Sequence, residues 1–358
     1  MARYFIRRLL ITIPVIFVVI FVVFALARLI PGNPCLDTLG ERATPAQCQQ
    51  FAIRYGLDQP IPVQFLVYLR DVASGDLGSS IKHAIPVTEL ITQRLPTTIE
   101  LSFFALIFAI GVGVPLGVAS AARRNSKTDA SSMAIANLGV STPVFVLGLL
   151  LAFLFAVVLK GSPLALPSQG RLSPGVSVKP LVEMWGLKDL QGPPRGILDF
   201  VSGFYVVTGL ITGQWNGAVD AFRHLILPAL ALGTIPMAII ARITRSSLLD
   251  VMGRDYIRTA RAKGVAENRI LVRHALRNAL LPIVTIIGLQ IGILLSGAVL
   301  TESVFNLSGV GRAVVEAISG RDYAVIQGFT LIIAIGFLVI NLLVDVSYAW
   351  LDPRVRLS

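Results

Sequence analysis

The feature that most limits the fold of this chain is a series of apolar runs, each long enough to cross a lipid bilayer as a helix. Six such runs lie at about residues 9–30, 99–121, 133–159, 225–243, 281–300 and 325–350. A crossing helix needs about 20 mainly apolar residues, and in lipid only helices and closed barrels satisfy their own backbone polar groups. The sequence therefore predicts an all-α polytopic membrane protein with six transmembrane helices.

The composition supports this class of protein and limits its partners. Hydrophobic residues occupy 54% of the 358 positions and charged residues only 14%, whereas soluble domains have about 25% charged residues. The formal net charge of +11 would suggest nucleic acid in a soluble protein. In a membrane protein the accumulation of Lys and Arg in cytoplasmic loops explains it. We therefore expect the lipid bilayer, and no nucleic acid, as a partner.

The distribution of basic residues predicts the orientation. Basic segments precede the first run, separate the second from the third and the fourth from the fifth, and follow the sixth. They contain Arg3, Arg7 and Arg8; Arg123, Arg124 and Lys127; residues 244–280; and Arg354 and Arg356. Six spans place all four segments on one side. Because basic loops face the cytoplasm, both termini are predicted to be cytoplasmic.

The predicted spans divide the chain into three parts. Residues 1–30 are expected to form an N-terminal transmembrane helix, and residues 31–97 an extracytoplasmic loop. Residues 98–358 are expected to form a core of five transmembrane helices, with an extracytoplasmic insert at 160–224 and a cytoplasmic loop at 244–280. The first run exceeds the roughly 7–15 residues of a signal peptide's apolar region. We therefore interpret it as an uncleaved span.

Two further features concern helix packing. Residues 196–213 are apolar enough to suggest a seventh span, but the segment is short and contains Asp199. A crossing there would also place the basic segment outside, so we predict an interfacial or packed helix outside the membrane. Gly113 and Gly117 form a small-xxx-small pair within a span, which predicts close helix packing.

The basic segment before the fifth run has the pattern of two short helices joined by a glycine. It reads DYIRTARAKGVAENRILVRHALRNALLP and begins at Asp255. In the first helix Arg254, Arg258 and Arg261 share a face, and Gly264 then permits a left-handed turn. The second helix has a basic face and an opposite face of small and apolar residues: Arg269, Arg273 and Arg277 against Leu271, Ala275 and Ala279. The segment is either a docking element for a cytoplasmic protein or a basic loop that only follows the topology rule.

This segment resembles the cytoplasmic EAA loop of ABC importer permeases, whose pattern is Glu-Ala-Ala, three residues, Gly, nine residues and Ile-x-Leu-Pro. Ala260, Gly264 and Leu276 match, whereas Arg258, Thr259 and Arg277 replace the Glu, the first Ala and the Pro. The form DYIRTARAKG is similar to that of dipeptide and oligopeptide permeases. Similar to that subfamily are also RRLLITIPVIFVVIFVVFALARLIPGNP, GDLGSS, RLPTTIELS, LTESVFNLSGVGRAVVEAISGRDYAVIQG and NLLVDVSYAWLDPRVR. The chain most resembles the first of the two permease subunits, which has a long loop after its first span.

The resemblance implies a fold, a set of partners and a cargo. It implies the type I ABC importer permease fold in a bacterial cytoplasmic membrane. A second permease subunit would complete a heterodimer, two ABC ATPase subunits would carry ATP and Mg, and an extracytoplasmic binding protein would deliver di- or oligopeptides. The chain itself would be a non-catalytic permease without a cofactor, in keeping with the absence of a GxxxxGK[ST] motif from the sequence.

The same resemblance implies which residues couple transport to the ATPases. The expected docking residues are Asp255, Tyr256, Arg258, Thr259, Ala260, Arg261, Ala262, Lys263, Gly264 and Arg273. Among them Arg258, Arg261 and Lys263 are expected to make the charged contacts, and Gly264 the turn. Polar residues in or near the spans are candidates for the translocation path: Glu100, Asn137, Gln290 and Glu302.

Three alternatives remain open at the level of the sequence. Permeases of this kind also carry nickel chelates, glutathione or sugar oligomers, and nothing in the spans selects one cargo. A secondary transporter is a second reading, although such proteins usually contain buried Asp, Glu or His relays, which are scarce here. A scaffold whose basic segment holds anionic lipid is the third.

The two cysteines, Cys35 and Cys48, share the loop predicted to be extracytoplasmic. That compartment is usually oxidising, and Thr44 can cap a helix that begins at Pro45 and returns Cys48 toward the start of the loop. We expect a disulfide, with two unpaired thiols as the alternative. No Cys/His cluster with metal-ligand spacing occurs in the sequence, so no metal site is predicted.

Overall fold

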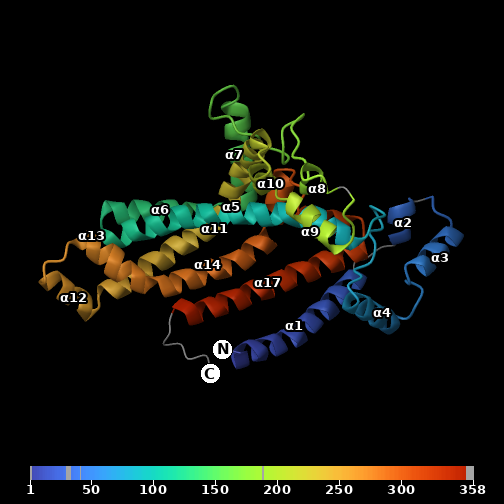
Figure 1. Cartoon of the computed structure of the whole chain (residues 1–358), viewed down its shortest axis with the longest axis horizontal. Helices are drawn as coiled ribbons and strands as arrows, with labels where there is room; N and C mark the ends of the chain where they lie inside the picture. Colours follow the sequence, from blue (N-terminus) through green and yellow to red (C-terminus); the bar gives the residue numbers. More distant parts are fainter. Residues whose placement is uncertain (1, 30–33, 41, 188, 352–358) are drawn as a thin grey trace. The chain divides into compact units, whose positions relative to one another are not determined.

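The computed structural model describes residues 2–29, 34–40, 42–187 and 189–351. The chain divides into two compact units, and each is described by itself. The first unit comprises Met1–Thr97, Lys179–Phe204 and Ser308–Leu338, and the second Thr98–Val178, Tyr205–Leu307 and Val339–Ser358. Helices dominate the described part of both units (Figure 1).

The first unit is organised around a cluster of aliphatic and aromatic side chains. Its helices are α1 (Ala2–Leu29), α2 (Pro34–Leu39), α3 (Pro45–Arg54), α4 (Ile61–Ala73), α8 (Leu181–Met184), α9 (Pro193–Ser202) and α16 (Val310–Ser319), with the beginnings of α5 (Val87–Ala122) and α17 (Tyr323–Leu351). Val87 and Leu90 of α5 pack with Val310 of α16 and Phe329 of α17 in its core. An isolated bridge between Ser79 and Pro86 precedes α5.

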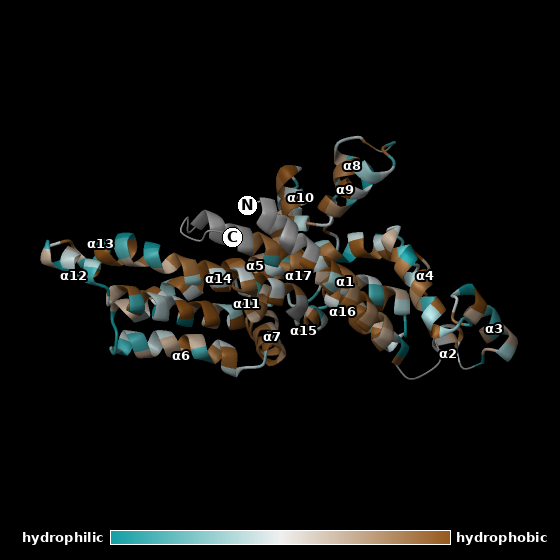
Figure 2. Ribbon diagram, turned by 90° about the horizontal axis from the view of Figure 1, so that it is seen from below, coloured by the Kyte–Doolittle hydropathy of each residue, from teal (hydrophilic) through white to brown (hydrophobic). Residues whose placement is uncertain are grey.

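The second unit is organised around α11 (Trp215–Met252). The other elements are α6 (Lys127–Ser141), α7 (Val144–Ala152), α10 (Tyr205–Ile211), α12 (Asp255–Ala262), α13 (Glu267–Arg269), α14 (Arg277–Gly297) and α15 (Val299–Val304), two π-helical segments at Phe153–Val158 and Ile270–Leu276, and the remainders of α5 and α17. Helix α11 packs against α14, α6, α7 and α10. Figure 2 shows long stretches of α11 and α14 in the hydrophobic colour.

Close packing at Gly113 and Gly117 confirms the small-xxx-small prediction. A Cβ atom on Gly113 would lie 2.7 Å from the carbonyl oxygen of Met237, and one on Gly117 would lie 2.5 Å from that of Ala241. These separations are too short for real Cβ atoms. The two glycines therefore allow α5 and α11 to approach each other backbone to backbone.

Four helices in the described residues are long and apolar enough to cross a membrane: Val87–Ala122, Trp215–Met252, Glu267–Leu295 and Tyr323–Val344. Helices Lys127–Ser141 and Val144–Val158 pass the same test together, but a 100° bend separates them. The described residues thus contain four spans, or five with the bent pair. The described part of the predicted first run, residues 9–29, is helical and belongs to α1. Its apolar stretch Ile11–Leu26 is shorter than the other candidate spans.

The span predicted at residues 133–159 is sharply bent in the structure. The helix stops at Ser141, because Thr142 is extended (φ −98°, ψ 124°) and Pro143 precedes α7. Proline lacks an N–H and disfavours helical backbone in the residue before it. Pro143 is thus the local cause of the bend within an otherwise apolar run.

Two helices lie at residues 196–213, and neither is long enough to span; the placement of this segment outside the membrane stays a prediction. Helices α9 and α10 contain 10 and 7 residues, or about 15 and 10 Å at 1.5 Å per residue. Within the second unit α10 is a packed helix, since a Cβ atom on Gly209 would lie 2.8 Å from the Cβ atom of Ala218 on α11.

A second correction concerns the segment after Gly264. The sequence suggested a short helix distinct from the fifth span. In the structure a single helix runs over Glu267–Leu295 and includes the π-helical segment Ile270–Leu276. Pro282 lies inside this helix, where it does not mark a boundary.

Candidate functional site

Helix α12 connects α11 to the helix Glu267–Leu295 in the second unit. Asp255 occupies its first turn, where a carboxylate interacts favourably with the helix dipole. At its other end Gly264 has φ +75°. The Val265 N–H donates to the Ala260 carbonyl at 3.2 Å and the Gly264 N–H to the Arg261 carbonyl at 2.9 Å. These two bonds form a Schellman motif, so the predicted left-handed turn at Gly264 is confirmed.

The main apolar anchor of α12 in the unit is Ile257. Ile257 is fully buried, with 0% of its surface exposed. It belongs to a cluster with Leu248 of α11 and with Ile270, Ala275 and Ile283 of the following helix. Because cores are closely packed and transmit displacement, α12 cannot shift far without moving the ends of both long helices.

Most of the remaining surface of α12 is exposed, and its charged side chains lie there. The side chains of Asp255 and Arg258 are 96% and 74% exposed and lie 3.5 Å apart. Across the turn, Arg261 Nε donates to Glu267 Oε1 at 2.7 Å. Asn278 Nδ2 donates to the Tyr256 hydroxyl at 3.1 Å. The helix thus exposes charged groups on one side and is anchored by Ile257 on the other. Figure 1 shows α12 next to α13.

The structure brings the expected docking residues together in one short stretch. Tyr256, Thr259, Ala262 and Lys263 are exposed like the charged residues, whereas Ala260 is only partly exposed and packs against the Ile257 cluster. Arg273 is exposed on the π-helical segment, after the turn. Their role in docking stays a prediction, because geometry alone does not identify a partner.

A partly exposed ion pair that sequence reasoning missed lies in the same unit. Arg245 of α11 binds Asp129 of α6 through two hydrogen bonds of 2.9 Å. The carboxylate also accepts hydrogen bonds from the Ser120 hydroxyl and the Asn125 backbone N–H. Ser126 caps α6 and accepts from the Asp129 N–H, which is the local signal that could have identified this turn. The pairing with Arg245 has no local signal.

Glu100, a candidate for the path, is engaged inside the second unit. Its carboxylate lies 3.0 Å from Arg171 Nη2 and accepts the Val206 N–H at 2.9 Å. The Arg171 guanidinium lies 3.7 Å from the centre of the Tyr205 ring. Burial lowers the pKa of Arg171, while the charge of Glu100 raises it. This cluster holds the loop that contains Arg171 against the start of α10.

The other path candidates are placed differently from one another. Glu302 is fully buried and accepts a hydrogen bond from the Thr98 hydroxyl. Gln290 is buried, and its Oε1 has no hydrogen-bond partner among the described residues. Asn137 is exposed on α6. The structure does not assemble these four residues into one site, and their assignment to a path stays a prediction.

In the first unit, Cys35 and Cys48 form a disulfide with a Cα–Cα distance of 5.5 Å. The expected cap is confirmed: the Thr44 hydroxyl oxygen accepts from the Gln47 N–H, Gln47 Oε1 accepts from the Thr44 N–H, and Pro45 begins α3. This capping box directs α3 so that Cys48 faces α2. Among the described residues, no group of three or more His, Cys, Asp or Glu side chains could hold a metal ion.

The long apolar helices and the anchored, charged helix α12 define the class of this protein as a helical membrane component. Residues 113–357 match the family described as "Binding-protein-dependent transport system inner membrane component". Residues 1–102 match the corresponding N-terminal family, "Binding-prot-dependent transport system membrane comp, N-term". The chain belongs to the family of binding-protein-dependent transport system inner membrane components. It is accordingly a non-catalytic permease subunit located in the inner membrane.

Curated relatives resemble the chain over its whole length. It is 45% identical over 356 residues to the dipeptide transport system permease protein DppB of Alkalihalophilus pseudofirmus, with 99% of this chain and 100% of the relative covered. It is 42% identical over 357 residues to the DppB protein of Escherichia coli K12, with 99% of both chains covered. A probable D,D-dipeptide transport system permease protein, DdpB, of the same organism is 40% identical over 334 residues, covering 93% of this chain and 92% of the relative.

Proposed function

We infer that this chain is the permease subunit of an ABC importer for dipeptides and other short peptides. The observation that carries this function is the identity of 45% and 42%, over 99% of the chain, to two proteins named as dipeptide permeases. An extracytoplasmic binding protein delivers the peptide. The permease pairs with a second permease subunit around the path, and two ABC ATPase subunits bind ATP and Mg.

The proposed topology has six spans and cytoplasmic termini, as in a type I importer permease. The six are α1, the four long helices and the bent pair Lys127–Ser141 and Val144–Val158. The positive-inside rule supports counting the pair as one crossing. If the pair instead returned to the same side, the segment at α12 would lie on the opposite side from Arg123 and Arg124.

In the proposed mechanism α12 transmits the closure of the ATPases to the path. Its charged face docks on an ATPase, and Ile257 links it to the ends of α11 and the helix Glu267–Leu295. Docking of a rigid element explains why the segment is helical, capped and anchored. ATP-driven closure would move both helix ends together and open the path outward, and hydrolysis would reset it.

Uptake of a radiolabelled dipeptide by cells with and without the gene for this chain tests the function. We expect uptake to be lost on deletion and restored by the intact gene. Uptake should stop when ATP is depleted and persist when an uncoupler collapses the proton gradient. A secondary transporter would respond in the opposite way. Restored uptake of a nickel chelate or glutathione, without any dipeptide uptake, would assign another cargo.

A further inference from the structure

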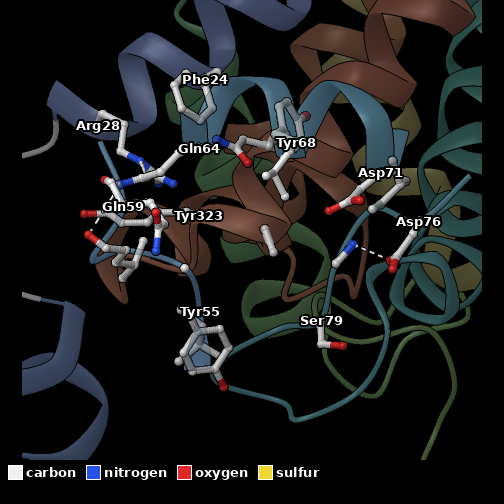
Figure 3. A pocket seen from close by; sticks show the side chains of 18 residues that line it. Phe24, Arg28, Tyr55, Gln59, Gln64, Tyr68, Asp71, Asp76, Ser79 and Tyr323 are labelled. Carbon is white, nitrogen blue, oxygen red and sulfur yellow. Dashed lines mark hydrogen bonds between the residues drawn. The ribbon is translucent and has the colours of Figure 1, made fainter. Parts of the chain in front are cut away.

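A cavity of about 230 Å³ lies within the first unit. Its walls come from the end of α1, from α4, from the chain on either side of α4 and from the start of α17 (Figure 3). Small-molecule pockets usually measure about 300–1,000 Å³, so this cavity fits only a small ligand. In the proposed topology it lies at the extracytoplasmic ends of α1 and α17.

Three polar atoms of the cavity lining are buried and lack a hydrogen-bond partner in the described structure. They are Arg28 Nη1, the Tyr68 hydroxyl and Gln327 Nε2. The first and third can only donate hydrogen bonds. Burial raises the pKa of Tyr68 to about 12, so its phenol keeps the proton and can donate as well. Leaving such groups unpaired in a protein interior is unfavourable, and together they suit a ligand that carries acceptors.

The Arg28 guanidinium is held in position without a carboxylate. Its Nε donates to Gln64 Oε1 at 2.8 Å, and Gln64 is itself fixed by bonds to the carbonyls of Leu57 and Gln59. The guanidinium lies 5.0 Å from the centre of the Phe24 ring and 4.9 Å from that of Tyr323. Aromatic rings stabilise a cation, but in the described structure no acidic side chain pairs with Arg28. An anionic ligand would supply the missing charge.

Two carboxylates line the other side of the same cavity. Figure 3 shows Asp71 and Asp76 on the side opposite Arg28. Tyr68 lies between Arg28 and these two carboxylates. Asp76 accepts the Gly78 N–H at 2.8 Å, and Asp71 pairs with the exposed Arg70. The cavity therefore has a cationic end and an anionic end, separated by aromatic surface.

We propose that this cavity binds a zwitterionic short peptide, with the peptide carboxylate on Arg28, Tyr68 and Gln327 and the peptide ammonium facing Asp71 and Asp76. The volume of about 230 Å³ lies below the usual range for small-molecule pockets, which suits a dipeptide and not a long oligopeptide. The site rests on the proposed function, because it gives the imported peptide a place on the permease itself. A phosphatidylethanolamine headgroup has the same zwitterionic chemistry, and the experiment separates the two sources.

The test measures binding to the full chain alone, without ATPases or binding protein. The purified chain is placed in nanodiscs of phosphatidylglycerol, and radiolabelled alanyl-alanine is titrated by equilibrium dialysis. We expect saturable binding, weakened about tenfold or more by Arg28→Gln and less by Tyr68→Phe, because loss of one charge-assisted contact has effects of this size. The carboxyl-amidated dipeptide should show the same loss on the unaltered chain. Arg54→Gln, an exposed change on α3 outside the cavity lining, is the matched control.

Thermal denaturation of each variant in the same nanodiscs separates lost binding from lost folding, and Tyr68→Phe changes no packing volume. Absence of saturable binding would overturn the site, as would equal binding by the folded Arg28→Gln variant. Loss of dipeptide binding in discs that contain phosphatidylethanolamine would mean that the lipid headgroup occupies the cavity. That result would overturn the proposal that the cavity binds a peptide. Uptake in cells that still depends on the chain, combined with no binding here, would reject the site and leave the proposed function standing.

Discussion

Arg245 and Asp129, 116 residues apart in the sequence, are joined by two parallel hydrogen bonds of 2.9 Å. Arg245 lies near the end of α11, just before α12, and Asp129 lies in the first turn of α6. The pair therefore ties the turn between α5 and α6 to the end of the helix that leads into α12. It stiffens the region from which the proposed coupling movement would start.

Asp129→Asn should destabilise the chain, because the substitution removes the charge that strengthens the hydrogen bonds to Arg245. The side chain of Asp129 is only 8% exposed, so water cannot replace the lost interactions. Thermal or denaturant unfolding in detergent measures the change. Asp250→Asn, an exposed carboxylate further along α11, is the control and should change stability little.

A double-mutant cycle with Arg245→Gln tests whether the two residues act as a pair. The combined loss should be clearly smaller than the sum of the single losses, because either substitution already breaks the interaction. Strictly additive losses would show that Asp129 acts through Ser120 and Asn125 instead of Arg245.

Gly264→Val should uncouple transport from ATP hydrolysis in the assembled complex, and Gly264→Asn should largely retain coupling. The reason is backbone conformation: Gly264 has φ +75°, and a Cβ atom there would meet nothing within 4 Å. Valine is strongly disfavoured in this region, whereas asparagine visits it readily. The ratio of peptide imported to ATP hydrolysed, in proteoliposomes, is the measurement. Normal coupling in the valine variant would show that the turn is not part of the mechanism.

The sequence predicted best those features whose cause is local. The Gly264 turn, the Thr44 cap and the long apolar helices depend on residues within a few positions of one another. The close approach at Gly113 and Gly117 was also predictable, because two small residues one turn apart leave a flat helix surface. In each case the deciding chemistry lies inside a single helix or turn.

The features that sequence reasoning missed depend on residues far apart or on one position within a uniform pattern. Nothing near Glu100 indicates its pairing with Arg171, and nothing near Asp129 indicates Arg245. Pro143 predicts a kink in its apolar run, but not a bend as large as 100°. The cavity around Arg28, Tyr68 and Gln327 could not be predicted either. These residues lie on α1, α4 and α17, and only the folded chain brings them together.

Ile257→Ala should loosen α12 from the unit without preventing membrane insertion. Removing most of a fully buried isoleucine costs roughly 2–5 kcal/mol, and here the loss falls on one short helix that opens locally. Trypsin should then cleave faster after the exposed Arg258 and Arg261, as measured by mass spectrometry of the fragments. Val272→Ala, at a position 60% exposed, is the matched control and should leave the rate unchanged. Equal cleavage rates for the two variants would mean that Ile257 is not the anchor.

The disulfide predicts how the two cysteines respond to alkylation. Cys35 and Cys48 are the two cysteines of the chain, and their separation of 13 residues corresponds to about 3 kcal/mol of stabilisation in the chain-entropy account. Denatured, unreduced protein should take up no alkylating label, and reduced protein should take up two labels, as measured by intact mass. Cys35→Ser should leave Cys48 as one freely labelled thiol, and thermal unfolding should show a lower stability of the loop. Two labels without reduction would establish that the cysteines are unpaired thiols. The loop between α1 and α3 would then be held by the Thr44 capping box and its packing alone.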